Sequence, residues 1–424
     1  MFFHVILYIK TFGCNINNFE SNNILKIIFY FKILLKKKLL NSDLIIINSC
    51  VIRKNPQLKI FKIIKKIIFL KKYKKNLIIL TGCLTETENL NFLKIIKVDI
   101  IFNSLSVLYI IKIIKNFFLN KKKIIFIKKN KLKILNKIST YLNIMSGCNH
   151  NCSYCIIPQI KGKESYLNYK KIFNFIIKNL KKKNCEITLL GQNVNSYKYN
   201  KINFSSLIFN ISKIKNIKRI NFLSSNLFDF NKKFLILYKN LKKISNHLHL
   251  PIQSGSNFIL KIMNRKYSIK KYLIFTKKIK KIKFTTLSTD IIISYPKEKF
   301  IDFDYSLKIL KKIKFLNYFC FLYSKRKNTL SYNFQENNNF LKFFKLKIFQ
   351  KNKNNYFILL NKKIRVLVIG YIKKNIFIGK MDNFKLIFFE YYNYNIIGKF
   401  IFVKVIDIKK NIFLGIYESF FNYL

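Results

Sequence analysis

The stretch MSGCNHNCSYC, residues 145–155, is the most informative part of this sequence. It follows a short apolar run of strand type and spaces three cysteines as Cys148-x-x-x-Cys152-x-x-Cys155. Three thiolates on one short loop can each bind one iron of a cubane iron–sulfur cluster and leave the fourth iron open. A zinc site usually takes four ligands, and His150 is the one nearby candidate for the fourth. The spacing therefore favours an open iron–sulfur site over a zinc loop or a set of core thiols.

The sequence around this loop alternates between apolar runs of strand type and longer stretches of helix type. The spacing of the runs, roughly 25–45 residues, is typical of a βα-barrel, complete or partial. In such barrels the functional groups lie on the loops that follow the strands, and the cysteine loop has this position. We therefore expect a βα-barrel domain over residues 138–330, with these strands: Tyr141–Met145, Glu186–Leu190, Arg219–Leu223, His247–Leu250, Leu287–Ser294 and Tyr318–Tyr323.

Residues 1–118 predict a separate α/β domain with a parallel sheet. Its apolar runs are short and rich in β-branched residues, as in strands that are buried on both faces. Longer stretches that are studded with Lys lie between them and are typical of helices. The expected strands are Phe3–Ile9, Leu44–Ile47, Leu77–Leu80 and Asp99–Phe102, and the expected helices include Ile24–Leu40 and Leu58–Leu70.

Three further cysteines, Cys14, Cys50 and Cys83, each follow one of these expected strands by a few residues. A lone cysteine is usually a small buried apolar residue. The carboxyl ends of parallel strands, however, form the ligand crevice of such a sheet, so the three cysteines could converge there. Together they predict a second open cluster site. Cys185 and Cys320 have no such setting, and we expect them to serve packing.

The pattern of the sequence changes in the last part of the chain. After an Asn- and Lys-rich helical linker at 331–360, residues 361–424 show short alternating strands with Gly turns. This pattern predicts a small all-β barrel of the oligonucleotide-binding type. Arg binds phosphate through a fixed fork that Lys cannot copy, so a retained Arg is the better pointer to a contact. The candidate nucleic-acid contacts are Lys362, Lys363, Arg365, Lys373 and Lys374.

The composition is strongly basic, with 82 Lys and Arg against 17 Asp and Glu and a formal net charge of +65. The chain has no Ala and five Arg, whereas Lys, Ile, Asn and Phe abound, which indicates AT-biased codon drift. The charge still attracts polyanions such as nucleic acid. Half of the residues are hydrophobic, which excludes a collagen-like or a disordered chain.

Neither a membrane span nor a secretory signal is expected. Lys residues interrupt the apolar runs before they reach about 18 residues. The N-terminus has no basic region and no small-residue cleavage site. We therefore expect a cytoplasmic protein without a membrane partner, whose eight cysteines are thiols or metal ligands.

Polar residues follow two of the expected barrel strands and are candidate cofactor contacts. Gln192 and Asn193 come after one strand, and Gln253 and Ser254 come after another. A strand-ending turn is the alternative interpretation at both places. His247 and His249 share one face of a strand, where they are equally well interpreted as barrel-interior residues or as substrate contacts.

Several motifs together resemble the radical S-adenosylmethionine methylthiotransferases, and within them the branch that modifies tRNA. The resemblance covers nearly the whole chain and includes a C-terminal domain similar to the family's TRAM module. It implies an N-terminal parallel-sheet α/β domain at 1–118, a radical S-adenosylmethionine partial barrel at 138–330 and a TRAM barrel at 361–424. The motifs are TFGCNINNFES around Cys14, NSCVIR around Cys50, TGCL around Cys83, the cysteine loop, LLGQNVNSY at 189–197 and HLHLPIQSGS at 247–256.

The resemblance implies an enzyme that adds a methylthio group to carbon 2 of N6-(dimethylallyl)adenosine next to the anticodon of tRNA. Its cofactors would be two [4Fe-4S] clusters and S-adenosylmethionine, and the chemistry would belong to them, so no separate catalytic side chain is assigned. One cluster would bind to Cys148, Cys152 and Cys155, and the other to the three N-terminal cysteines. The expected partners are tRNA and an electron donor of the flavodoxin or ferredoxin type, and we expect a monomer.

Two alternatives remain open at this point. One is a relative that acts on threonylcarbamoyl-adenosine in tRNA or on a ribosomal protein, and the other is a decayed, non-catalytic iron–sulfur protein that binds RNA. Three loops also depart from the family's pattern and could differ in geometry. The family's Ser-x-His-Pro, Phe-Pro-Gly-Glu and Tyr-Ser-Pro-Arg-Pro-Gly-Thr runs correspond here to Ser224–Leu227, Tyr295–Glu298 and Tyr323–Thr329.

Overall fold

The computed structural model divides the chain into two compact units, residues 1–132 and 133–424. No helix among the described residues is both long and apolar enough to cross a membrane. The structure describes residues 5–12, 15–28, 33–35, 42–49, 60, 62–65, 67, 69, 76–82, 98–101, 138–180, 185–335, 344–345, 347–349, 355–373, 375–409 and 412–418.

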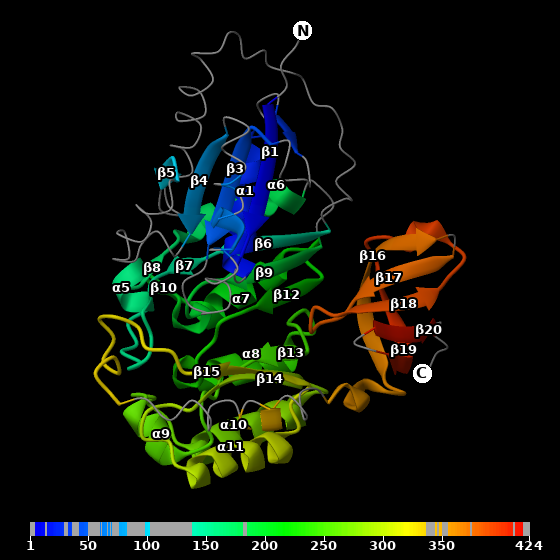
Figure 1. Cartoon of the computed structure of the whole chain (residues 1–424). Helices are drawn as coiled ribbons and strands as arrows, with labels where there is room; N and C mark the ends of the chain where they lie inside the picture. The colour runs from blue at the N-terminus through cyan, green and yellow to red at the C-terminus, as the bar shows by residue number, and fades with distance from the viewer. Residues whose placement is uncertain are drawn as a thin grey trace. The chain divides into compact units, whose positions relative to one another are not determined.

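The first unit contains a five-stranded parallel sheet in the order β2-β1-β3-β4-β5 (Figure 1). Helix α1 (Asn15–Ile28) follows the first strand, and Ile24 packs with Leu7, Leu44 and Leu77 in the core. Every residue of β3 and β4 is buried, as expected for apolar strands in the middle of a parallel sheet. The strands are β1 (Val5–Thr11), β2 (Ile33–Leu35), β3 (Leu44–Ser49), β4 (Leu77–Gly82) and β5 (Ile100–Ile101).

The expected helix over Ile24–Leu40 is wrong. Helix α1 begins earlier, at Asn15, and ends at Ile28, and the run Ile33–Leu35 forms strand β2 beside β1. A short apolar run can be strand or helix, and here the free edge of β1 provides a pairing partner. The helix expected over 58–70 is described as helical at residues 60, 62–65, 67 and 69.

The second unit begins with six parallel strands in chain order, as the sequence predicts. They form two three-stranded sheets, β12-β9-β6 and β13-β14-β15, and a bridge between Ile220 and Ile244 joins the two. The result is a partial barrel (Figure 1). The strands are β6 (Ser139–Asn143), β9 (Glu186–Leu190), β12 (Arg219–Phe222), β13 (His247–His249), β14 (Thr286–Ile293) and β15 (Asn317–Leu322).

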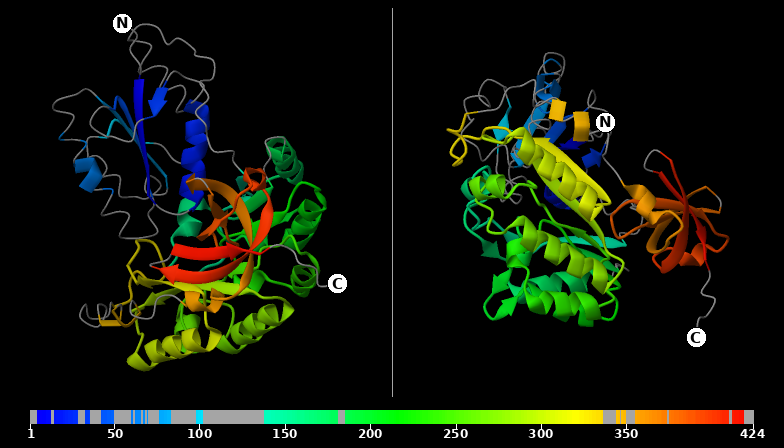
Figure 2. Two further views of the ribbon diagram at one scale, coloured as in Figure 1. Left: turned by 90° about the vertical axis from the view of Figure 1, so that its right-hand side faces the viewer. Right: turned by 90° about the horizontal axis from the view of Figure 1, so that it is seen from below.

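Helices connect these strands and lie along their outer side (Figures 1 and 2). Several begin with a residue whose side chain accepts a backbone N–H, namely Asn203, Asn231, Ser256 and Ser268. The helices are α5 (Ile157–Lys161), α6 (Tyr169–Leu180), α7 (Phe204–Lys213), α8 (Lys232–Asn240), α9 (Asn257–Ile262), α10 (Ile269–Ile282) and α11 (Phe300–Ile313). Short elements between them are β7 (Met145–Ser146), β8 (Ser165–Tyr166), η2 (Val194–Ser196), β10 (Lys198–Tyr199), β11 (Ile202–Asn203) and η3 (Leu227–Asp229).

The chain ends in a closed five-stranded barrel with the order β16-β17-β18-β20-β19, drawn in orange and red in Figure 2. Its interior is filled by Val366, Phe377, Val403 and Phe413 among others. The expectation of a small all-β barrel in this part is therefore confirmed. The elements are η4 (Tyr356–Leu359), β16 (Lys363–Lys373), β17 (Ile376–Lys380), β18 (Leu386–Glu390), η5 (Tyr394–Ile396), β19 (Phe400–Lys409) and β20 (Ile412–Tyr417).

Candidate active site

The cysteine loop leaves the barrel after β6 and β7 and runs into α5. Its first residue, Gly147, has a φ of 78°, and a Cβ atom there would lie 2.1 Å from the carbonyl oxygen of Lys163. Position 147 therefore requires glycine. The N–H of Cys148 then donates to the carbonyl of Gly162 at 3.2 Å, while β7 pairs with β8. These contacts close the loop at its base.

The three thiols of the loop are half-buried, and none forms a disulfide. Burial raises the pKa of both Cys148 and Cys155, so the thiol form is favoured while the loop holds no metal. The backbone N–H of His150 donates to the sulfur of Cys148 at 3.4 Å. Metal ligation requires thiolates, so assembly of a cluster on these residues would release protons.

His150 does not complete a zinc site with the thiols. Its Nε2 lies 2.7 Å from Oδ2 of Asp229, and its ring packs edge-on against Phe228. Among the described residues, no three His, Cys, Asp or Glu side chains gather closely enough to hold one metal ion. A cubane cluster instead takes one thiolate per iron, which suits a loop with three separate thiols. The donor set therefore fits an iron–sulfur cluster with an open iron better than a closed zinc site.

Asp229 joins three loops of the site, and sequence reasoning missed it. It lies in η3 after strand β12 and contacts His150 of the cysteine loop. Its Oδ2 also accepts a hydrogen bond from Nδ2 of Asn193, after strand β9, at 2.7 Å. Only the fold brings these residues together, since Asp229 is separated from His150 by 79 positions.

Gln192 and Asn193 lie where the sequence predicts, at the carboxyl end of β9. The N–H of Asn193 contacts the sulfur of Met145 at 3.3 Å. The amide oxygens of Gln192 and Asn193 are buried, and neither has a hydrogen-bond partner in the described part of the chain. Buried acceptors without partners are rare and often mark a ligand site. These two oxygens therefore fit donor groups of a bound molecule, such as an amino group or a hydroxyl.

Gln253 and Ser254 differ from each other in their surroundings. Gln253 has a φ of 69°, and its backbone forms hydrogen bonds with the backbone of Asp290 and Ile292 in β14. Ser254 is fully buried, and its hydroxyl accepts the N–H of Ser256 at 3.2 Å near the start of α9. This contact is the strand-ending turn that the sequence left as an alternative. Gln253, which is half-buried, is the better candidate for a contact to a ligand.

Arg265 places a guanidinium beside the cysteine loop. Its Nη1 lies 3.5 Å from the sulfur of Cys152, and its Nη2 donates to the hydroxyl of Tyr267 at 2.9 Å. The same nitrogen contacts the carbonyl of Pro251 at 3.3 Å. A fixed positive charge at this distance stabilises a thiolate or an anionic cluster. Its retention in a sequence with only five Arg is the signal that could have found it.

Comparison with known proteins identifies the family. The Radical SAM superfamily matches residues 142–310, and Uncharacterized protein family UPF0004 matches residues 6–103. The tRNA-2-methylthio-N(6)-dimethylallyladenosine synthase of Buchnera aphidicola subsp. Cinara cedri is 40% identical over 399 residues, which cover 88% of this chain and 92% of the relative. The protein of the same name from Clostridium tetani is 34% identical over 428 residues, or 94% of this chain and 93% of the relative. The chain belongs to the radical S-adenosylmethionine methylthiotransferase family.

As a methylthiotransferase, the chain is an enzyme of the radical S-adenosylmethionine class, whose cofactors are iron–sulfur clusters and S-adenosylmethionine. A solved structure of the radical S-adenosylmethionine methyltransferase TsrM from Kitasatospora setae is similar, with a TM-score of 0.55 and 8% sequence identity. The similarity covers 78% of this chain and 75% of that one, and it supports the fold.

This methylthiotransferase keeps left-handed backbone in the three loops that depart from the family's pattern. Lys297 stands where the family usually has Gly, with a φ of 65°, and Asn328 stands where another Gly is usual, with a φ of 63°. Ser224, in the third loop, has a φ of 65°. Glu298 still accepts the N–H of Ser294 at 2.7 Å. At Lys297 and Asn328 the residue type differs from the family's Gly, while the positive φ that favours glycine is present.

The histidines of the HLHLP run have partners inside the barrel. Nδ1 of His247 lies 2.8 Å from the hydroxyl of Thr286, and its Nε2 lies 3.0 Å from that of Ser288. Burial lowers the pKa of His247, and the neighbouring His249 lowers it further. These contacts favour the interpretation as barrel-interior residues over that as substrate contacts.

The N-terminal cysteines of this methylthiotransferase, Cys14, Cys50 and Cys83, lie outside the described residues. The strand ends that precede them are described. Ser49, the last residue of β3, pairs with Gly82, the last residue of β4, and Asn48 pairs with Thr11 at the end of β1.

These strand ends are joined by a buried polar network. Nδ2 of Asn48 donates to the carbonyl of Asn17 at 2.9 Å, and Ser49 donates its hydroxyl to the carbonyl of Thr81 at 2.6 Å. The three strands therefore end side by side at one edge of the sheet.

Proposed function

We propose that this chain adds a methylthio group to carbon 2 of N6-(dimethylallyl)adenosine next to the anticodon of tRNA, with two [4Fe-4S] clusters and S-adenosylmethionine. The observation that carries the proposal is the loop of three half-buried free thiols after the first strands of a partial barrel. It occurs in a chain that is 40% identical, over 88% of its length, to a synthase of that name.

The first cluster would bind to Cys148, Cys152 and Cys155. When bound, it supplies the electron that cleaves S-adenosylmethionine and thus the radical chemistry that opens a carbon–hydrogen bond. Arg265 would stabilise the negative charge at Cys152 through its contact at 3.5 Å. The unpartnered amide oxygens of Gln192 and Asn193 would accept hydrogen bonds from S-adenosylmethionine or from the substrate base.

The second cluster would bind to Cys14, Cys50 and Cys83. The support for this assignment is the register of the strands before them, since β1, β3 and β4 end side by side. Cys50 and Cys83 are the residues that directly follow paired strand ends, Ser49 and Gly82. Thiolates are the ligands that iron and sulfide clusters prefer.

The C-terminal barrel would act as a TRAM module that binds tRNA. Small barrels of this kind bind nucleic acid with basic and aromatic surface residues. Tyr371 and Tyr392 are exposed to 52% and 76%, and Lys362 and Lys363 are also exposed. Arg365 is half-buried against Phe400, so it is less available to RNA than Lys362 and Lys363.

The remaining expectations also belong to this proposal. An electron donor of the flavodoxin or ferredoxin type would reduce the first cluster. We expect the enzyme to work as a monomer on tRNA in the cytoplasm, without a membrane partner.

The experiment that tests the function is mass spectrometry of tRNA nucleosides from a bacterial host that lacks its own methylthiotransferase. Expression of this chain should produce 2-methylthio-N6-(dimethylallyl)adenosine, and Cys148→Ala should abolish it. Cys320→Ala, which removes a thiol inside β15, is the matched control and should leave the product unchanged. Methylthiolated threonylcarbamoyl-adenosine, or a modified ribosomal protein, would instead indicate a related substrate.

Metal analysis of anaerobically purified protein separates the enzyme from a decayed binding protein. Two clusters predict about eight iron per chain. One or two zinc with no iron would contradict the proposal. Cys148→Ala should also lose the formation of deoxyadenosine from S-adenosylmethionine, and continued formation would refute the assignment of the first cluster.

A further inference from the structure

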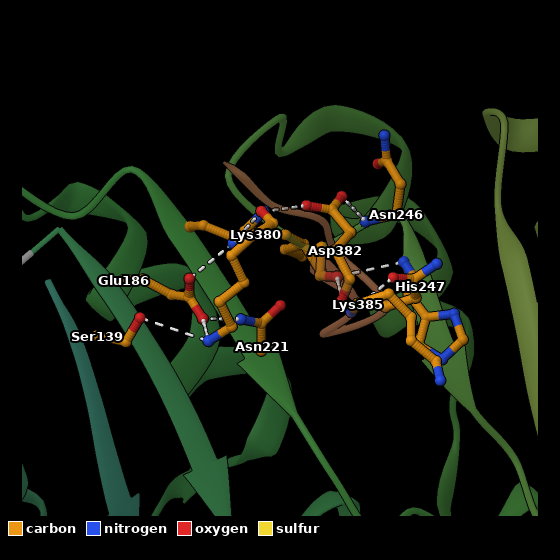
Figure 3. A network of polar contacts seen from close by, with 12 residues as sticks. Ser139, Glu186, Asn221, Asn246, His247, Lys380, Asp382 and Lys385 are labelled. Carbon is orange, nitrogen blue, oxygen red and sulfur yellow. Dashed lines mark hydrogen bonds and ion pairs between the residues drawn. The ribbon is translucent and has the colours of Figure 1, made fainter. Parts of the chain in front are cut away.

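A buried charge network joins the partial barrel of strands β6 to β15, called the core below, to the C-terminal barrel (Figure 3). It lies where the core strands begin and at one turn of the C-terminal barrel. Both parts lie in the second unit. Glu186 begins β9 and Arg219 begins β12, whereas Lys380 ends β17 and Asp382 lies in the turn before β18. These four side chains, two acidic and two basic, meet at one place.

Arg219 is the centre of the network and has no exposed surface. Its Nη2 lies 2.7 Å from Glu186, and its Nη1 lies 2.6 Å from Asp382. The same two nitrogens donate to the carbonyl of Lys380 at 3.2 and 3.3 Å. One guanidinium thus holds groups from the core and from the barrel at the same time.

The other members complete the pairing of charges. Nζ of Lys380 lies 2.7 Å from Oε1 of Glu186, which also accepts from Asn221 at 2.8 Å. Burial alone would raise the pKa of Glu186, but Arg219 and Lys380 lower it, so the carboxylate is ionised. Oδ2 of Asp382 accepts the backbone N–H of Asn246, before β13, at 2.7 Å. Lys380 and the turn after it therefore contact the starts of three core strands, β9, β12 and β13.

The contact extends beyond the four charges. The ring of Phe400, which begins β19, lies 5.0 Å from the guanidinium carbon of Arg219 and 5.0 Å from that of Arg365. The sulfur of Cys185 lies 3.5 Å from the carbonyl of Gly398. A joint with several contacts of this kind restricts rotation of the barrel as well as its separation from the core.

The composition of the chain makes this set unusual. The whole sequence has 17 acidic residues and five Arg, and two acids and one Arg lie in this joint. With a net charge of +65, most contacts between surfaces of this chain would repel. Here the two positive and the two negative charges balance.

We propose that Asp382 is a positioning residue that fixes the C-terminal barrel on the core and so sets its orientation toward the cysteine loop. The joint lies at the amino ends of the strands, whereas the cysteine loop follows their carboxyl ends, so Asp382 does not touch the reacting groups. The effect on tRNA rests on the proposed function of the chain. The contact between the barrel and the core does not depend on that function.

The test compares Asp382→Asn with Asp407→Asn in the full-length enzyme. Asp407 belongs to the same barrel and pairs with Lys409 in a largely exposed contact, so it matches the change of charge without the joint. The first measurement is small-angle X-ray scattering together with limited proteolysis. Asp382→Asn should increase the radius of gyration and speed cleavage in the linker before the barrel, and Asp407→Asn should change neither.

The second measurement separates positioning from chemistry. Reductive cleavage of S-adenosylmethionine without tRNA should keep its wild-type rate in Asp382→Asn, whereas KM for tRNA should rise about tenfold or more, because the barrel no longer presents the RNA in one orientation. Scattering, proteolysis and KM equal to those of Asp407→Asn would overturn the proposal. If Asp382→Asn does not fold, Lys380→Gln opens the same joint through Glu186 and is judged by the same outcomes.

A failure of the proposed function is recognised separately. A wild-type enzyme that makes no methylthiolated tRNA contradicts the function, and the scattering and proteolysis still decide whether the joint exists. A wild-type enzyme that is active, with an Asp382→Asn variant like its control, contradicts the positioning role alone.

Discussion

Oδ2 of Asp229 lies 2.7 Å from Nε2 of His150 and 2.7 Å from Nδ2 of Asn193, so one carboxylate oxygen ties the cysteine loop to the loop after β9. The contact explains why His150, the one candidate for a fourth metal ligand, is directed elsewhere. It also makes the cysteine loop dependent on a residue that is not a ligand.

Replacement of Asp229 by Asn should weaken the first cluster. His150 loses its charged partner, and the loop that carries Cys148 and Cys152 loses a support, so we expect a loss of about 10- to 100-fold in cluster affinity or activity. Iron content and deoxyadenosine formation measure it. Asp304→Asn, in a surface pair with Lys308, is the control. Equal iron content and rate in both variants would show that the contact does not support the cluster.

Arg265→Lys should also lower the occupancy of the cluster. Lys keeps the charge but cannot contact Cys152, Tyr267 and the carbonyl of Pro251 at once, as the guanidinium does. The visible absorbance of the reconstituted cluster, and its loss on exposure to a chelator, are the measurements. A variant that retains iron as well as the wild type would show that charge alone suffices at this position.

Lys297→Gly should stabilise the second unit. A left-handed conformation costs a residue with a Cβ about 1–2 kcal/mol, and part of the gain is offset by the greater freedom of Gly in the unfolded chain, so we expect about 0.5–1 kcal/mol. Asn tolerates this conformation better, so Asn328→Gly should gain less. The melting temperature measures both. Lys327→Gly, beside Asn328 and without a positive φ, should instead lower it.

The stability of the partial barrel that contains His247 should fall as the pH drops below about 6.5. The pKa of His247 is lowered in the folded state, so between the folded and the unfolded pKa the unfolded chain binds a proton that the folded chain does not. The contribution of His247 is therefore intact above the unfolded pKa and is lost as the pH falls. Melting temperatures between pH 5 and 8 should decline less steeply for His247→Gln, and parallel curves would assign the loss to other groups.

The sequence predicted local structure well where one pattern decides it. Glu186–Leu190 is predicted as a strand and observed as one, because it is a short, largely apolar run between a Lys-rich stretch and Gly191. Gly147, directly before Cys148, has a φ of 78°, a backbone conformation that favours glycine.

Long-range pairing could not be predicted in the same way. Arg219 and Asp382 are 163 positions apart, and nothing local to either residue indicates the other. Asp229 was missed for the same reason. Strand β2 was missed because Ile33–Leu35 has no intrinsic preference that outweighs helix, and the free edge of β1 decides its conformation.

The register at the edge of the N-terminal sheet restricts how the chain can change in length. Ser49 pairs with Gly82, and side chains alternate between the two faces of a strand. One residue inserted into β3 would carry the following segment to the opposite face and out of step with β4. Drift in base composition can replace residue types throughout these strands with other apolar ones. An insertion or deletion between a strand and the cysteine after it would change this register, so we expect insertions and deletions to be rarer there than substitutions.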